Sequence, residues 1–234
     1  MIPLKMLPQP DDQTCGPTSL HAVYSYFGDT ISLEQVIREM TFLEGGGTLA
    51  VLLGCHALKR GYTAKIYTYN LLMFDPTWFK NKDNLSEKLT AQKEYKPHRP
   101  KLQKATQAYL EFLSLGGELA HENLTTNLLN TYFHRSIPIL AGLSATYLYE
   151  CARECGTNKT VYDDLRGEPS GHFVVLCGHD DNDQKVIVAD PYLSNPVSND
   201  HYYRVQHQRL INAIMLGILT FDANILIIEP KQKK

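Results

Sequence analysis

The chain has 234 residues, of which 43% are hydrophobic and 21% charged, and its formal net charge at pH 7 is −2. This composition is typical of a globular protein and gives no electrostatic reason to expect binding to nucleic acid or to an anionic membrane. The longest apolar stretches, such as residues 213–221, are too short to cross a bilayer, and residues 1–5 lack the apolar core of a secretory signal. We therefore expect a cytoplasmic protein with no membrane span.

Helices dominate the first half of the predicted fold. Apolar residues recur with the helical spacing i, i+3, i+4 and i+7 after Cys15, and Ser32 with Gln35 has the capping-box pattern that opens a helix. Thr48 is expected to cap a third helix. In chain order the predicted elements are helices at 15–27, 32–40 and 49–60, a strand at 62–69, a helix at 100–115 and a strand at 118–121.

Strands become more frequent in the second half of the chain. The run Phe173–Cys177 is continuously apolar, which is typical of a central strand, and residues 180–183 have the composition of a tight turn before a return strand. The predicted elements are a helix capped by Thr125 or Thr126 with Leu128 to Phe133 on its apolar face, helices at 145–155 and 208–217, and strands at 137–143, 173–177, 185–189, 202–205 and 225–228. No linker or repeat divides the chain, so we expect a single domain over residues 1–234.

The five cysteines are thinly spread and odd in number, which does not favour a disulfide framework in a chain of this size. Cys151 and Cys155 are expected to share one face of the helix at 145–155. They have no second cysteine pair and no histidine at ligand spacing, so zinc is a weak interpretation. The sequence therefore predicts no metal and no cofactor.

Cys15 lies between a polar turn and an apolar helix. The free amide hydrogens and the dipole of a helix N-terminus favour the thiolate, which is the nucleophilic form of cysteine. Gln9 lies six residues earlier and can fold back to offer its side-chain amide to an oxyanion near the sulfur. Taken alone, a cysteine in this position is more often a buried structural residue than a nucleophile.

Two later residues supply the partners that a nucleophilic cysteine needs. A hairpin with its turn centred on Asp181 would place His172 directly opposite Asp190 on one face of the sheet, at a distance suited to a hydrogen bond. In the order Cys, His, Asp, the histidine takes the proton of the thiol and the aspartate orients the ring. The alternative for His172 and Asp190 is a pair of residues that merely flank a turn.

These motifs together resemble the bacteriocin-processing double-glycine peptidases of bacteria. The similar segments are Gln9, Cys15-Gly-Pro-Thr-Ser, Thr48-Leu-Ala-Val-Leu-Leu, Ile137-Pro-Ile, Gly171-His-Phe-Val-Val-Leu and Val188-Ala-Asp190-Pro. The resemblance implies an α+β, papain-like fold, in which an N-terminal helix carries Cys15 and an antiparallel sheet carries His172 and Asp190. It also implies that Gln9 is the oxyanion residue and that the region around 70–117 is an insertion.

The sequence thus predicts a thiol peptidase or amide hydrolase that acts on a peptide or protein substrate through Cys15, His172, Asp190 and Gln9. Leader-peptide processing is one form of this activity. Two alternatives stay open: an acyl transferase that uses the same residues, and a catalytically silent relative that binds peptides in the same cleft. The presence of all four residue types disfavours the silent relative.

Overall fold

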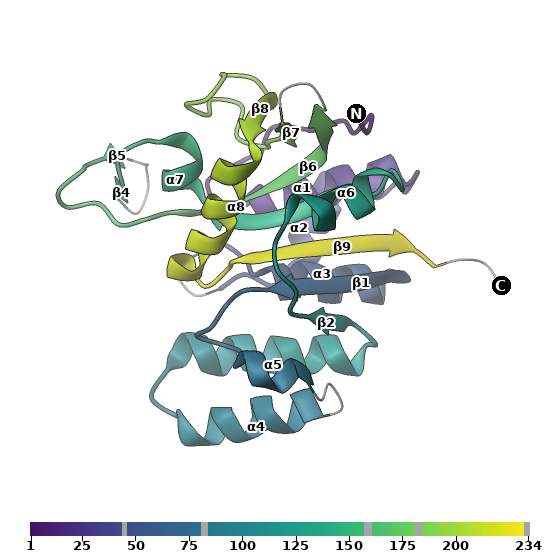
Figure 1. Cartoon of the computed structure of the whole chain (residues 1–234), viewed down its shortest axis with the longest axis vertical. Helices are drawn as coiled ribbons and strands as arrows, with labels where there is room; N and C mark the ends of the chain where they lie inside the picture. Colours follow the sequence, from purple (N-terminus) through teal and green to yellow (C-terminus); the bar gives the residue numbers. More distant parts are fainter. Residues whose placement is uncertain (44–45, 81–83, 157–160, 181–183, 232–234) are drawn as a thin grey trace.

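Seven of the strands that the structure describes form one mixed sheet in the order β2-β1-β9-β3-β6-β7-β8 (Figure 1). The structure is a computed structural model, and it describes residues 1–43, 46–80, 84–156, 161–180 and 184–231. All neighbouring strands run antiparallel except β1 and β2. The strands are β1 (Tyr62–Thr68), β2 (Glu118–Ala120), β3 (Ile139–Ser144), β6 (Gly171–Asp180), β7 (Lys185–Ala189), β8 (Tyr202–Gln206) and β9 (Asn224–Pro230).

Helices cover both faces of this sheet. The N-terminal helices α1 (Cys15–Tyr26), α2 (Leu33–Glu39) and α3 (Ala50–Lys59) lie behind it in Figure 1, with α1 packed on β6 and α3 on β1. On the other face lie α6 (Thr126–Phe133), which packs on β6, and α8 (His207–Leu216), which packs on β3. The central strands are consequently buried on both sides, which explains the continuous apolar run in β6.

The segment between β1 and β2 extends beyond the β2 edge of the sheet (Figure 1). It contains the short 3₁₀ helix η1 (Pro76–Lys80) and the helices α4 (Leu85–Tyr95) and α5 (Pro100–Ser114). Phe112 of α5 is fully buried, and a Cβ added to Gly54 of α3 would lie 2.6 Å from its ring. The segment therefore shares the hydrophobic core of the sheet instead of forming a separate one.

Local sequence signals place several helix starts correctly. The Ser32 hydroxyl accepts a hydrogen bond from the Gln35 amide (3.2 Å), and Thr125 caps α6 through the Leu128 amide (3.2 Å). The prediction for Thr48 is wrong, because Leu49 is the N-cap of α3 and the Thr48 hydroxyl donates to the carbonyl of Thr41 instead.

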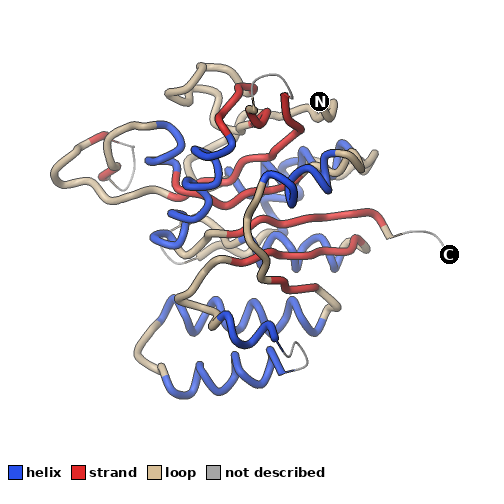
Figure 2. The backbone as a smooth tube through the Cα atoms, in the orientation of Figure 1, coloured by secondary structure: helices blue, strands red, loops and turns tan. Residues whose placement is uncertain are grey.

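The helix predicted at 145–155 is much shorter than expected. Helix α7 (Ala145–Tyr149) ends at Glu150, whose φ of 53° is left-handed and breaks the helix. The chain then forms the two-stranded ribbon of β4 (Glu154–Cys155) and β5 (Val161–Tyr162), which projects from the body of the protein (Figure 2). Cys151 and Cys155 therefore do not share a helix face.

Across the described parts of the chain, no helix has both the length and the apolar character that crossing a bilayer requires.

Candidate active site

Cys15 is the first residue of α1, and its side chain is buried with 8% exposure. Two contacts hold this end of the helix against its neighbours. The Ser19 hydroxyl donates to the carbonyl of Phe173 in β6 (3.1 Å), and a Cβ on Gly16 would lie only 2.5 Å from the Thr48 side chain. Glycine at position 16 thus allows α1 to approach the segment that leads into α3 closely, while Ser19 fixes α1 next to the strand that carries His172.

His172 lies near the start of β6 and forms a hydrogen bond to Asp190 that joins Nε2 and Oδ1 at 2.8 Å. The histidine is 7% exposed and Asp190 is fully buried. Burial alone would lower the pKa of His172, but the charge of its hydrogen-bonded partner Asp190, together with the nearby Cys15 side chain, raises it to about 10. The structure therefore brings His172 against both of the other predicted site residues.

Asp190 accepts three further hydrogen bonds besides the one with His172. The hydroxyls of Tyr149 and Tyr203 donate to Oδ2 at 2.9 and 2.6 Å, and the amide of Tyr192 donates to Oδ1 at 2.8 Å. Burial alone would raise the pKa of this carboxyl, yet His172 and the hydrogen bonds hold it below its ordinary value of 3.8. Asp190 is therefore kept ionised and fixed in one orientation.

The predicted register of the β6–β7 hairpin is wrong. Asp180 pairs with Lys185, so the hairpin loop is centred beyond Asp181, and Val175 pairs with Ala189. Continuing that register places Asp190 opposite Val174, two residues from His172. The tip at 181–183 lies outside the described residues. Because a shift of two keeps the same face of the sheet, His172 and Asp190 still meet, as diagonal neighbours.

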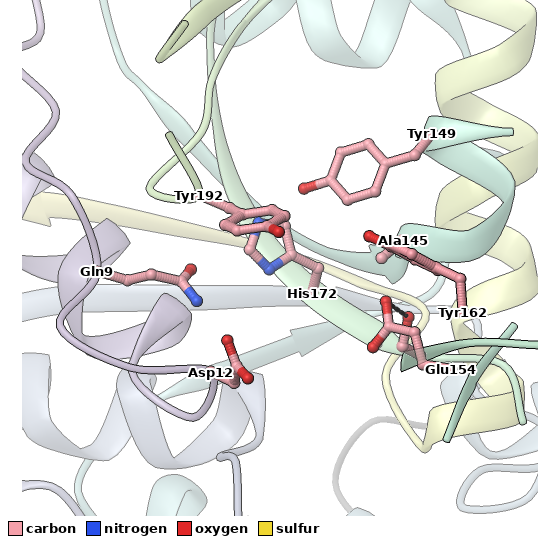
Figure 3. Close-up of a pocket in the computed structure, with 10 residues that line it drawn as sticks. Gln9, Asp12, Ala145, Tyr149, Glu154, Tyr162, His172 and Tyr192 are labelled. Carbon is pink, nitrogen blue, oxygen red and sulfur yellow. Dashed lines mark hydrogen bonds between the residues drawn. The ribbon is translucent and has the colours of Figure 1, made fainter. Parts of the chain in front are cut away.

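Gln9 approaches the same site from the N-terminal loop (Figure 3). Its backbone amide donates to the carbonyl of Pro191 (2.9 Å), which ties the loop to the residue after Asp190. Its side-chain Nε2 donates to the carbonyl of Asp11 (2.9 Å), while its Oε1 is buried and has no hydrogen-bond partner among the described residues. Gln13 points elsewhere, because its side-chain amide packs against Gly46. A Cβ added to that glycine would lie only 2.5 Å from the amide carbon of Gln13.

A polar cleft opens beside His172 (Figure 3). Its far wall comes from the β4–β5 ribbon, which supplies Glu154 and Tyr162; Glu154 accepts a hydrogen bond from the Ser170 hydroxyl (2.8 Å). The lining residues are Gln9, Asp12, Ala145, Tyr149, Glu154, Tyr162, Ser170, Gly171, His172 and Tyr192.

Residues 1–212 match the sequence profile of the Peptidase_C39 like family. The chain belongs to this family. Membership confirms both the predicted resemblance to double-glycine peptidases and the prediction of a cysteine peptidase-like hydrolase. No sequence among the curated proteins matches this chain.

Two solved structures of C39 type are similar to this chain. A protein described as a C39-like peptidase from Bacillus anthracis is 15% identical, with a TM-score of 0.53, and the match covers 100% of this chain and 98% of that one. The peptidase domain of Streptococcus ComA, a bifunctional ABC transporter of a quorum-sensing pathway, is 16% identical over 97% of this chain and 99% of that one, with a TM-score of 0.46. The Bacillus anthracis structure confirms the predicted α+β, papain-like fold.

The sequence did not identify the tyrosines that surround Asp190 in this C39-like chain. Tyr149 comes from α7, Tyr192 follows Asp190, and Tyr203 comes from β8. The alternation of buried and exposed residues in β8 was a usable signal, because it puts Tyr203 and Val205 on the inward face. Which carboxylate Tyr203 would reach depends on the pairing of β7 with β8, and sequence alone does not supply that pairing.

Proposed function

We propose that the chain is a thiol peptidase in which Cys15 is the nucleophile, His172 the acid and base, Asp190 its orienting group and Gln9 an oxyanion donor. The observation that carries this proposal is the position of His172, which is bound to a fully buried carboxylate and contacts Cys15 at a helix N-terminus. This combination matches the arrangement that nucleophilic catalysis by cysteine requires.

The chemistry follows from these positions. The proton of the Cys15 thiol moves to His172, and the sulfur attacks the carbonyl carbon of the peptide bond. The carbonyl oxygen gains negative charge, which the amide of Gln9 and a backbone amide at the start of α1 stabilise. His172 then gives its proton to the leaving amine, and water, activated by the same ring, hydrolyses the thioester.

Peptide substrates with small residues before the scissile bond are the class that the double-glycine resemblance implies. We infer leader-peptide processing as the specific form of the activity. Two fluorogenic peptides, identical except that Gly-Gly or Leu-Leu precedes the scissile bond, test it directly. Preferential cleavage of the Leu-Leu peptide would contradict leader processing while leaving peptidase activity intact.

Selective alkylation tests the nucleophile itself. Burial raises the pKa of Cys55 and of Cys177 to about 12, and Cys151 is more exposed than Cys15 but also has a raised pKa. Brief iodoacetamide treatment followed by peptide mass spectrometry should modify Cys15 first, even though Cys151 and Cys155 are both more exposed, and the His172→Ala variant should lose this preference. Labelling of Cys151 ahead of Cys15 in the wild-type protein would count against the proposal.

A further inference from the structure

The far wall of the cleft beside His172 carries a carboxylate that neutral donors hold in place. Glu154 lies in β4, and its backbone amide and carbonyl both pair with Glu168, at 3.0 and 2.8 Å, which fixes this strand. Its side chain accepts a hydrogen bond from the Ser170 hydroxyl (2.8 Å), and the Ser170 amide donates in turn to the Thr146 hydroxyl (3.0 Å). These contacts orient the carboxylate without bringing a positive charge to it.

The basic residues of the β4–β5 ribbon that the structure describes are bound to the ribbon itself. Arg153 donates to a backbone carbonyl of the ribbon, and Arg166 forms an ion pair with Asp163 (2.6 Å). None of the described residues that line the cleft is a lysine or an arginine, whereas Asp12 adds a second acid across the cleft from Glu154 (Figure 3). Apart from the catalytic histidine, the charge of the cleft walls is therefore negative.

Aromatic rings complete the walls of the cleft. Tyr149, Tyr162 and Tyr192 all line it, and the ring centroids of Tyr149 and Tyr192 lie 6.4 Å apart (Figure 3). The face of a tyrosine ring attracts a cation, and aromatic cages bind ammonium groups in this way. The cavity volume of about 60 Å³ is room for about five water molecules, which suits the charged head of a single side chain.

The cleft lies on the side of the candidate site from which the amine leaves. The described residues that line it include His172, which protonates the leaving amine in the proposed mechanism, but not Cys15. Ser170, which holds Glu154, is two residues before His172, so roughly 7 Å of extended chain separates them. A long side chain on the residue after the scissile bond spans this distance, whereas a glycine before the bond has no side chain to do so.

We propose that Glu154 and the three cleft tyrosines select a peptide substrate with lysine or arginine directly after the scissile bond. The inference rests on the proposed peptidase function, and it adds a preference on the leaving side to the small residues expected before the bond. Glu154 is then a specificity-determining residue, and the β4–β5 ribbon is the element that sets the preference.

Three internally quenched peptides test this preference. They are identical, with Gly-Gly before the scissile bond, except that the next residue is lysine, norleucine or glutamate. Norleucine has nearly the length of lysine without its charge, so the ratio of kcat/KM for the lysine and norleucine peptides isolates the effect of the cation. We expect this ratio to be about ten or more in the wild-type protein and to fall as salt is raised from about 50 to about 500 mM.

Substitutions of Glu154 should change this ratio. Glu154→Gln should bring it close to one, because the amide still accepts the hydrogen bond of Ser170 but carries no charge. Glu154→Lys should reverse the preference, so that the glutamate peptide is cleaved faster than the lysine peptide.

The matched control is Glu168→Gln. It removes the same charge from the residue that pairs with Glu154 through the backbone, but Glu168 is exposed and does not line the cleft. This variant should keep the ratio of the wild-type protein. A ratio near one in the wild-type protein, or equal losses in Glu154→Gln and Glu168→Gln, would overturn the proposal.

Binding is measured apart from catalysis in the Cys15→Ala variant, with fluorescein-labelled lysine and norleucine peptides and fluorescence anisotropy. The lysine peptide should bind about tenfold more tightly, and adding Glu154→Gln should remove this difference. Equal affinities of the two peptides for Cys15→Ala would also overturn the proposal. Failure of the peptidase proposal would appear differently, as wild-type protein that cleaves none of the three peptides and shows no preferential alkylation of Cys15.

Discussion

Two carboxylate–histidine pairs in this protein have similar hydrogen bonds and opposite protonation behaviour. Asp190 bonds His172 at 2.8 Å, and Glu39 of α2 bonds His56 of α3 at 3.1 Å. His172 also contacts Cys15, and His56 also bonds the Tyr24 hydroxyl at 2.8 Å. The pKa of His172 is raised to about 10, whereas burial lowers the pKa of His56 below 6.5 despite its bond to Glu39.

The exposure of the carboxylate explains this difference. The Asp190 side chain is fully buried, whereas 43% of the Glu39 side chain is exposed. Solvent screens the charge of Glu39, so its attraction for a proton on His56 does not offset the cost of burying the charged ring. In this protein the raised histidine pKa accompanies a buried carboxylate that accepts further hydrogen bonds, and the lowered histidine pKa accompanies an exposed carboxylate.

The third partner also differs between the two pairs. Tyr24 is fully buried, and burial raises its pKa far above the ordinary value of 10, so it stays a neutral hydroxyl. The Glu39–His56–Tyr24 chain joins three helices, α2, α3 and α1, and contacts no part of the candidate cleft that the structure describes. We assign it a structural role in holding α1, and therefore Cys15, in place.

The largest expected effect comes from replacing His172 with glutamine. The same replacement of His56 is the comparison. His172→Gln should lower kcat/KM by roughly 10³-fold or more, because it removes the proton carrier. His56→Gln should stay within a few fold of wild type and lower the thermal midpoint of unfolding instead. Steady-state kinetics and thermal unfolding of both variants measure this contrast, and comparable losses of kcat/KM would remove the distinction between the two pairs.

The next largest effect concerns the two glutamines before Cys15. Gln9→Ala should lower kcat by roughly 10–10³-fold with little change in KM, because an oxyanion donor acts mainly in the transition state. Gln13→Ala should change kcat much less, since its side chain packs against Gly46 outside the cleft. A large kcat loss for Gln13→Ala beside a nearly normal Gln9→Ala would reverse the assignment.

Removing one donor to Asp190 should have a smaller effect. Tyr203→Phe deletes the 2.6 Å hydrogen bond to Oδ2 and should lower kcat roughly tenfold, with KM changed much less. Tyr202→Phe is the matched control, because its hydroxyl bonds the Leu4 carbonyl and the Met6 amide instead. If both variants lose stability but only Tyr203→Phe loses kcat, Tyr203 is a positioning residue. If the kcat values of Tyr203→Phe and Tyr202→Phe are equal, Tyr203 contributes to stability alone.

The last prediction concerns the pH dependence of stability, where the two histidines should have opposite signs. The raised pKa of His172 stabilises the fold fully below pH 6.5, and this contribution is lost as the pH rises toward 10. The lowered pKa of His56 does the reverse, so its contribution is present above pH 6.5 and is lost as the pH falls. Urea unfolding of wild type, His172→Gln and His56→Gln between pH 5 and 10 measures both slopes, and slopes of the same sign would contradict the comparison.

Local sequence signals determined most of the elements and the start of α1. A polar turn, a glycine and a proline at positions 16 and 17, and an apolar helical stripe are short-range features, so their conformational preferences act without the rest of the fold. The same holds for β6 and β7, whose alternating side-chain directions put His172 and Asp190 on one face even though the predicted register was shifted by two residues.

Only the tertiary structure decided which groups complete the candidate site. Cys15 and His172 are far apart in the chain, and they meet because α1 packs on β6 through Ser19. The hydroxyls on Asp190 come from Tyr149 and Tyr203, which belong to elements whose neighbours no local pattern specifies. The protonation of His172 in turn depends on the burial of Asp190, and burial is a property of the whole packed sheet and its helices.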